Sequence, residues 1–173
     1  MPRRPFALLV LAAISSCACG HAAADGAAFR VLPGLDLRAF DCAAAPGAVV
    51  IRSPAELPQA TAHAASCSPE QARTASAALR RGLAAADVHW SREALVVVAD
   101  VYGGSGMAKP HLEISTAAPD SLEARVVWAL PPPPLTPDTA HARLAFAVDA
   151  KQVRTVTVVT SSGRSPLAVG ASR

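Results

Sequence analysis

Polar and apolar residues alternate with a period of two along much of the second half of the chain, which is the pattern of half-buried β-strands. The alternation is clear over residues 111–116, 122–128 and 144–148. Residues 94–102 (ALVVVADVY) instead form a continuous, largely β-branched run that predicts a central strand covered on both faces. Residues 153–160, rich in threonine and valine, predict a closing strand. Joined by short connections, these strands predict an antiparallel meander.

Two helix starts lie upstream of these strands. Residues 53–56 (SPAE) and 68–71 (SPEQ) each place serine at an N-cap, proline at the first helical position and Glu or Gln three residues after the serine. This spacing is typical of a capping box. Pro58 limits the first helix, whereas apolar residues recur at helical spacing behind the second one, through Ala86.

The fold class that follows is α+β, with a small antiparallel β-sheet of four to six strands packed against one or two short helices. An edge strand over 29–41 and a short buried strand over 48–51 complete the expected elements. The domain organisation is a signal peptide at 1–16, a lipidated tether at 17–28 and a single globular domain at 29–173.

The first residues carry an export signal. Arg3 and Arg4 precede a uniformly apolar stretch over 6–14, which is shorter than the ~20 residues that a membrane-spanning helix needs. The stretch runs into the tetrapeptide ISSC at 14–17, which is similar to the bacterial lipobox. We therefore expect cleavage before Cys17, a diacylglyceryl group on its thiol and stable attachment to a lipid bilayer. The alternative is an ordinary cleaved signal that happens to contain cysteine.

The expected location and the net charge of the mature chain limit the classes of partner that it can bind. Ala18, directly after the lipidated cysteine, favours the outer membrane over the inner one, and the domain would face the periplasm. Removal of residues 1–16 leaves 14 basic and 13 acidic residues, so the mature chain is nearly neutral. No basic cluster remains to attract nucleic acid.

The remaining cysteines suggest a disulfide. Cys42 and Cys67 lie in the globular part, in a compartment where disulfides persist. Their pairing is a hypothesis, and Cys19 would then be the odd thiol. Neither a CxxC pair nor a Cys/His cluster is present, so no metal and no other cofactor is expected.

Two features could support catalysis, but each has a simpler interpretation. Ser105 is surrounded by glycines, yet Met107 occupies the last position of the G-x-S-x-G nucleophile elbow, so a flexible turn explains the glycines. His111 and Glu113 share one strand face and could bind a metal. Such a pair is more often solvated or salt-bridged across strands. No catalytic residue is assigned.

Two segments are better candidates for binding. The first is the turn that follows the central strand, and the second is a stiff proline loop that can bind with little entropy to lose. The candidate binding residues are Tyr102, Gly103, Gly104, Ser105, Pro131, Pro132, Pro133 and Pro134. A plain turn and a plain connection are the alternatives. Of the two tryptophans, Trp128 is expected in the core and Trp90 at the junction of helix and sheet.

Residues 88–93 (VHWSRE), running into the apolar strand, resemble a pattern in the PrcB-like family, which is named after a protease-complex subunit. In that family an aromatic-Ser-basic-acidic segment leads a hydrophobic strand. The features that follow it match a Gly-rich turn, an alternating strand, a proline loop and a closing hairpin, here at 103–104, 111–114, 131–134 and 143–158. The resemblance covers about residues 48–160. The chain departs from the family's Thr-Gly-Gly-Tyr turn at Tyr102–Ser105, and His89 stands where an acid is common.

The resemblance implies an exported accessory or binding domain without chemistry of its own. Our first hypothesis is therefore a membrane-anchored envelope lipoprotein that acts as a non-catalytic interaction domain, with an envelope protein such as a protease as its partner. The alternatives are a small-ligand carrier with a pocket between sheet and helix, and a hydrolase or metal-dependent enzyme that uses Ser105 or the His111 and Glu113 pair.

Overall fold

The computed structural model describes residues 28–40, 47–61, 68–104, 106–133 and 137–170. These residues form two four-stranded sheets. The strands of the first sheet, in spatial order, are β1 (Phe29–Val31), β6 (Thr139–Asp149), β3 (Glu93–Gly103) and β2 (Gly47–Ile51). Those of the second sheet are β4 (Lys109–Ala118), β5 (Ser121–Ala129), β7 (Thr155–Thr160) and β8 (Gly163–Ala168).

The α+β class is confirmed, whereas the simple meander is wrong. β3 pairs along its whole length with β6, from Glu93 opposite Asp149 to Gly103 opposite Thr139. The β4–β5 hairpin lies between them in sequence but belongs to the other sheet, where β5 pairs in parallel with β7. The physical reason is burial, because β3 and β6 are apolar on both faces and each face needs its own cover.

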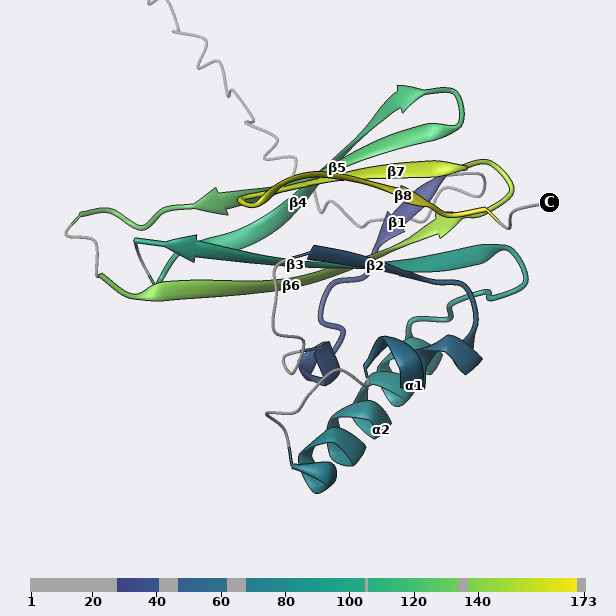
Figure 1. Ribbon diagram of the computed structural model, residues 1–173, viewed down its shortest axis with the longest axis horizontal. Helices are drawn as coiled ribbons and strands as arrows, with labels where there is room; N and C mark the ends of the chain where they lie inside the picture. Colours follow the sequence, from purple (N-terminus) through teal and green to yellow (C-terminus); the bar gives the residue numbers. More distant parts are fainter. Residues whose placement is uncertain (1–27, 41–46, 62–67, 105, 134–136, 171–173) are drawn as a thin grey trace, which may run out of the picture.

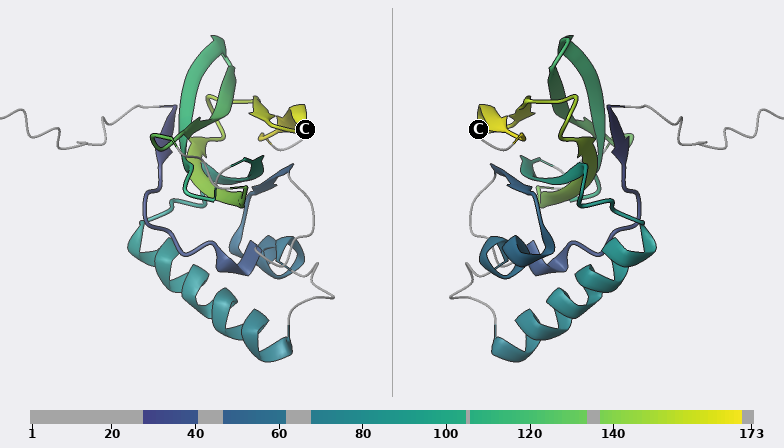
Figure 2. Two further views of the ribbon diagram at one scale, coloured as in Figure 1. Left: turned by 90° about the vertical axis from the view of Figure 1, so that its left-hand side faces the viewer. Right: turned by 90° about the vertical axis from the view of Figure 1, so that its right-hand side faces the viewer.

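The molecule therefore has three layers (Figures 1 and 2). Between the two sheets lies one apolar core, in which Val96, Phe146 and Val156 are fully buried. On the opposite face of the first sheet, Leu95 and Val97 pack against Leu79 and other residues of the helical layer. The central strand is thus covered on both faces, as its sequence predicts.

The helical layer confirms one capping prediction and corrects the other. Helix α2 (Pro69–Ala85) begins with a full capping box, in which the Ser68 hydroxyl accepts from the Gln71 amide at 3.2 Å and the Gln71 side chain accepts from the Ser68 amide at 3.1 Å. Ser53 makes no such side-chain bond. The Glu56 carboxylate accepts instead from the Arg52 amide, and the segment forms a 3₁₀ turn, η2 (Pro54–Glu56), followed by the short helix α1 (Leu57–Ala60).

The ends of the chain depart most from the expected elements. The predicted strand over 29–41 stops at Val31, since the turn at Pro33 and Gly34 intervenes and Gly34 adopts a φ of +77°. Residues 38–40 form a 3₁₀ turn, η1 (Arg38–Phe40), in the helical layer. Strand β8 was not expected from the sequence. Within the described ranges, no helix has the length and apolar character needed to cross a membrane.

Candidate functional site

The inter-sheet face of β3 changes character toward one end. Ala94, Val96 and Val98 face the second sheet as part of the apolar core. Because side chains alternate along a strand, the same face continues with Asp100 and Tyr102. Asp100 is only 1% exposed, so a carboxylate occupies a buried position between the two sheets.

The Asp100 carboxylate is held by four hydrogen bonds. Its Oδ1 accepts from the backbone amides of Val101 at 2.9 Å and Ser161 at 3.0 Å, and from the Ser161 hydroxyl at 2.5 Å. Its Oδ2 accepts from the indole Nε1 of Trp128 at 3.0 Å. Burial of a charged group is costly unless such partners replace water. Asp100 therefore ties β3 to both β5 and the β7–β8 turn of the opposite sheet.

Trp128, which donates to Asp100, also contacts Tyr102, nearer the end of β3. Its ring lies 5.6 Å from the ring of Tyr102, centroid to centroid, with an angle of 32° between the planes. This separation is within the range of favourable aromatic pairs. The Tyr102 ring is close to Gly104, because a Cβ added at this glycine would lie 3.5 Å from the tyrosine Cε1.

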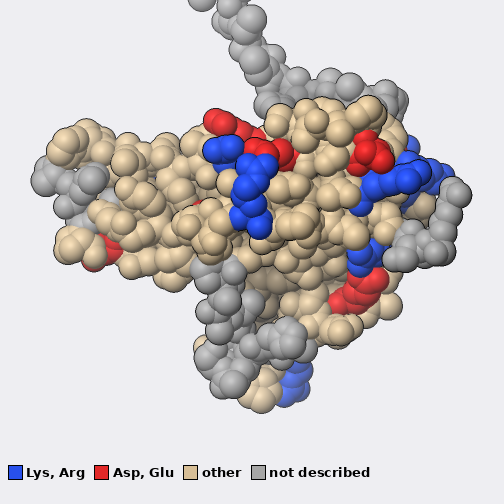
Figure 3. All heavy atoms as spheres, turned by 45° about the horizontal axis from the view of Figure 1, so that its top comes forward, with Lys and Arg blue, Asp and Glu red and all other residues tan. Residues whose placement is uncertain are grey.

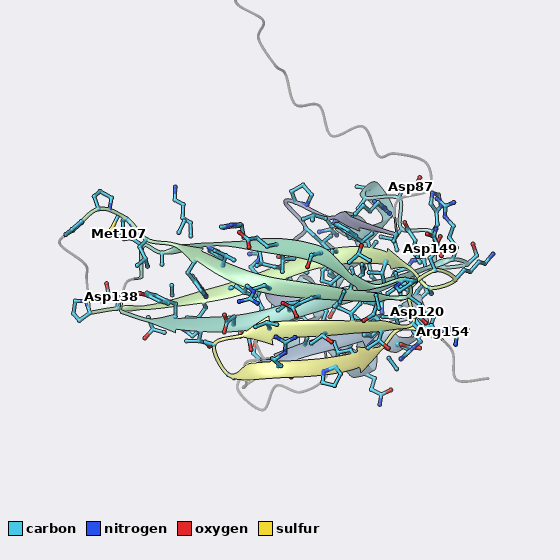
Figure 4. The ribbon with its side chains drawn as sticks, turned by 90° about the horizontal axis from the view of Figure 1, so that it is seen from above. Asp87, Met107, Asp120, Asp138, Asp149 and Arg154 are labelled. Atoms are coloured by element: carbon cyan, nitrogen blue, oxygen red, sulfur yellow. The ribbon has the colours of Figure 1, made fainter. Side chains whose placement is uncertain are left out.

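The turn after β3 and the proline loop before β6 meet at this end. The Gly104 amide donates to the carbonyl of Asp138 at 3.2 Å. A Cβ on Gly106 would stand 2.9 Å from the Asp138 Cβ, so only glycine fits there without a shift. Figure 4 shows Met107 and Asp138 together at one end of the sandwich. We call this surface the tip and define it by residues 102–104, 106–107, 130–133 and 137–138.

The tip is apolar and exposed. Of the large hydrophobic side chains that stand out to solvent in the described ranges, Met107 (65% exposed) and Leu130 (50% exposed) are in the tip, and Val31 (47%) lies elsewhere. The only charged residue within the described part of the tip is Asp138. Figure 3 shows little charge toward this end, while blue and red side chains gather over the middle and the opposite end. Exposed apolar surface of this kind marks interaction sites.

The structure thus brings together most of the binding residues expected from the sequence. Tyr102, Gly103 and Gly104 on one segment, and Pro131, Pro132 and Pro133 on the other, belong to the same tip. Ser105 and Pro134 lie outside the described residues, as do Cys17, Cys42 and Cys67. Asp100 was not among the residues predicted from the sequence, although a carboxylate in phase with Val96 and Val98 in a buried strand was a usable signal.

The opposite end of the sandwich, which we call the base, receives the chain from the N-terminal side. Ala28 accepts a hydrogen bond from the Asp149 amide, and Phe29 pairs with Val148. Figure 4 shows Asp149, Asp120 and Arg154 at this end, away from Met107 and Asp138. β3 spans eleven residues between base and tip, which corresponds to about 33 Å at the usual rise per residue.

An ion pair fixes β1 at the base. The Arg30 guanidinium donates to both carboxylate oxygens of Glu93 at 2.9 Å and to the carbonyls of Ala86 and Asp87 at 2.8 Å. Glu93 also accepts from the His89 amide at 2.8 Å. The hydrogen bonds from Arg30 hold the pKa of the Glu93 carboxyl below its ordinary value, against the opposing effect of burial.

The His111 and Glu113 pair, considered above for catalysis, is exposed to solvent. His111 and Glu113 share the outer face of β4, with 3.7 Å between Nε2 and Oε1, and their side chains are 53% and 64% exposed. A pair so open to water gains little from its charges. The described ranges contain no group of three or more His, Cys, Asp or Glu residues that could hold a metal ion.

A groove of about 600 Å³ lies beside β2, between the first sheet and the helical layer. Val49, Val97 and Ala60 give it an apolar lining, with Arg52 and Glu56 among its polar residues. Phe40 and Gly47 also line it, and the chain between them lies outside the described residues. Its position matches the pocket between sheet and helix expected for a small-ligand carrier.

Comparison with known proteins adds no relative: no family model, no curated protein and no solved structure matches this chain. The resemblance to the PrcB-like family therefore stays a prediction from short sequence motifs.

Proposed function

We propose that this protein is a lipid-anchored envelope domain that binds a partner protein through the tip, without chemistry of its own. The observation that carries the proposal is the pair of exposed apolar side chains, Met107 and Leu130, on a tip held by defined contacts. Exposed apolar side chains that can enter a pocket of the partner are typical anchors of binding surfaces.

The positions of the base and the tip, at opposite ends of the sandwich, support a role in binding a partner protein. If Cys17 is lipidated, the membrane lies on the N-terminal side of residue 28, and residue 28 enters the sandwich at the base. Ala28 is eleven positions after Cys17, and this length of chain spans at most about 40 Å when fully extended. The tip is at the far end of the sandwich from the point where the tether joins it, which leaves it accessible to other proteins of the envelope. An envelope protease is the first partner class to test, given the resemblance described above.

The anchor is tested by mass spectrometry of the protein purified from bacterial membranes. We expect the N-terminal peptide to begin at Cys17 and to carry acyl groups. An unmodified peptide that begins elsewhere would contradict the anchor and, with it, the orientation of the tip.

The tip is tested by site-specific photo-crosslinking in cells. A photoreactive residue at position 107 should yield a protein adduct of defined mass, and the same residue at position 151, in the exposed turn at the base, should not. A second substitution, Leu130→Ser, should reduce the adduct several-fold, whereas Val31→Ser, an equally exposed apolar residue outside the tip, should not. Equal adducts at 107 and 151, or adducts with lipid in place of protein, would overturn the proposal.

The small-ligand alternative has one observation in its favour, the groove beside β2. A melting temperature that rises with a bound apolar ligand would support a carrier. The substitution Val49→Trp, which would fill the groove, should then abolish that rise without affecting the adduct at position 107.

A further inference from the structure

We propose that Asp100 is the positioning residue of the tip: through Trp128 and Tyr102, its carboxylate holds the apolar binding surface in one arrangement. The inference rests on the proposed function of the tip. It adds that the shape of the binding surface is set from inside the sandwich, by a residue that contacts no partner.

The contacts form a continuous chain from the core to the surface. The carboxylate accepts from the Trp128 indole at 3.0 Å, and the two aromatic rings lie 5.6 Å apart. The Tyr102 ring lies close to Gly104, since a Cβ added at this glycine would be 3.5 Å from the tyrosine Cε1. Gly104 in turn donates to the Asp138 carbonyl of the proline loop. The first, second and last of these steps are direct contacts, and Tyr102 and Gly104 are two residues apart in the chain, so we infer that a change at Asp100 reaches both segments of the tip.

The ends of β3 and β5 need such a positioning contact, because they extend beyond two of the neighbouring strands. β2 pairs with β3 only as far as Ala99, and β7 pairs with β5 only as far as Arg125. Beyond these positions, the ends of β3 and β5 continue toward the tip without those neighbouring strands. In this projecting part, Tyr102 and Trp128 are the aromatic side chains that meet between the two sheets. Asp100 stands where the four-stranded sheets end and the projection begins.

A carboxylate suits this position better than an apolar residue would. An apolar side chain would fill the space but would leave the indole N–H and the Ser161 amide without acceptors, and unpaired buried donors favour rearrangement. The carboxylate accepts from donors on three different segments at once, which fixes the Trp128 ring in orientation as well as in depth.

The chain offers unusually clean probes for a test. Tyr102 is its only tyrosine, and its methionines are Met1 and Met107. Removal of the signal peptide would leave Met107 as the single methionine of the processed protein. A ¹³C-methyl label on methionine therefore reports on the tip alone, in the processed full chain and without any partner. Replacement of Trp90 by phenylalanine leaves Trp128 as the single tryptophan, so tryptophan fluorescence then reports on Trp128 alone.

The test compares Asp100→Asn with Ser161→Ala. An amide at position 100 cannot accept from both Trp128 and the Ser161 amide, whereas Ser161→Ala removes one hydroxyl at Oδ1 and leaves the Trp128 contact in place. We expect Asp100→Asn to shift or split the Met107 methyl resonance, to raise acrylamide quenching of Trp128 at least two-fold and to reduce the adduct at position 107 several-fold. Ser161→Ala should leave all three near wild type, even if it lowers the melting temperature.

The outcomes separate this inference from the proposed function. If both variants only lower the melting temperature, with the Met107 resonance and Trp128 quenching unchanged, Asp100 is merely structural and the inference is wrong. If the wild-type protein gives no adduct, the proposed function fails, while the two spectroscopic measurements still decide the positioning role. Should Asp100→Asn fail to fold, Trp128→Phe removes the same donor and keeps the other three bonds of Asp100, and it should also shift the Met107 methyl.

Discussion

The ion pair between Arg30 and Glu93 yields the sharpest stability prediction. It joins β1, the first strand after the expected tether, to β3 and to the carbonyls that end α2. The Glu93 side chain is 9% exposed and the Arg30 side chain 28% exposed. The substitution Glu93→Gln keeps the shape of the side chain but removes its charge, so it tests the electrostatic contribution with little change in packing.

The size of the effect follows from the burial of the pair. Loss of one partner from a fully buried ion pair costs about 3–5 kcal/mol. Arg30 is partly solvated and keeps its bonds to two carbonyls, and glutamine still accepts one hydrogen bond, so we expect a smaller loss, of about 2 kcal/mol at pH 7. For a urea m-value of about 2 kcal/mol/M, this lowers the unfolding midpoint by about 1 M.

The pH dependence gives the decisive measurement. The pKa of Glu93 in the folded state is below its ordinary value of 4.5, chiefly because of the hydrogen bonds from Arg30. The stabilisation is therefore complete above pH 4.5 and is lost as the pH falls through the folded-state pKa. Wild type and Glu93→Gln should differ most near neutral pH, and their unfolding midpoints should converge in acid.

The matched control is Glu123→Gln. The pKa of Glu123 is also lowered by arginine, through hydrogen bonds from Arg125 and Arg164, but these two arginine side chains are 51% and 61% exposed, against 28% for Arg30. Its substitution should change the urea midpoint much less, because water screens the pair. Equal effects at the two positions, or a Glu93→Gln difference that persists undiminished in acid, would refute the reasoning.

Three further predictions concern the core, the helix and the disulfide. Phe146→Ala opens a cavity between the sheets at a fully buried position and should lower the free energy of unfolding by about 3–5 kcal/mol in urea titration. Ser68→Ala breaks the capping box and should lower it by about 1 kcal/mol, with a Ser68→Asp variant close to wild type. Non-reducing peptide mapping should find Cys42 linked to Cys67, and reduction should lower the unfolding free energy by roughly 3–4 kcal/mol; free thiols at both positions would remove the disulfide.

Local signals in the sequence were enough for helix α2 and for most of the strands with their buried faces. The capping box at Ser68 depends on contacts within four residues, and it forms as predicted. The alternation over residues 122–128 places Leu122, Ala124 and Val126 in the core, because a strand has only two faces. The failure at Ser53 has a local cause as well, since the Glu56 carboxylate has a second amide, that of Arg52, within reach.

The candidate site was predicted in part. The turn after the central strand and the proline loop were each identified from their residues, since glycine and proline have strong local preferences. Their meeting depends on the pairing of β3 with β6, which brings Gly103 opposite Thr139 across 36 positions of sequence. No local pattern encodes that partner, because an apolar strand is compatible with several neighbours.

What the sequence alone determined is therefore helix α2, most of the strands with their buried faces, and two exposed segments rich in glycine and proline; it did not predict β8 or the early end of β1. Only the tertiary structure decided that the strands divide into two sheets, that the two segments form one tip opposite the base, and that Asp100 lies beneath it. The physical reason is that strand pairing and the burial of a carboxylate are settled by contacts between residues far apart in the chain, such as Asp100 and Ser161. Such contacts become favourable only when the whole core assembles.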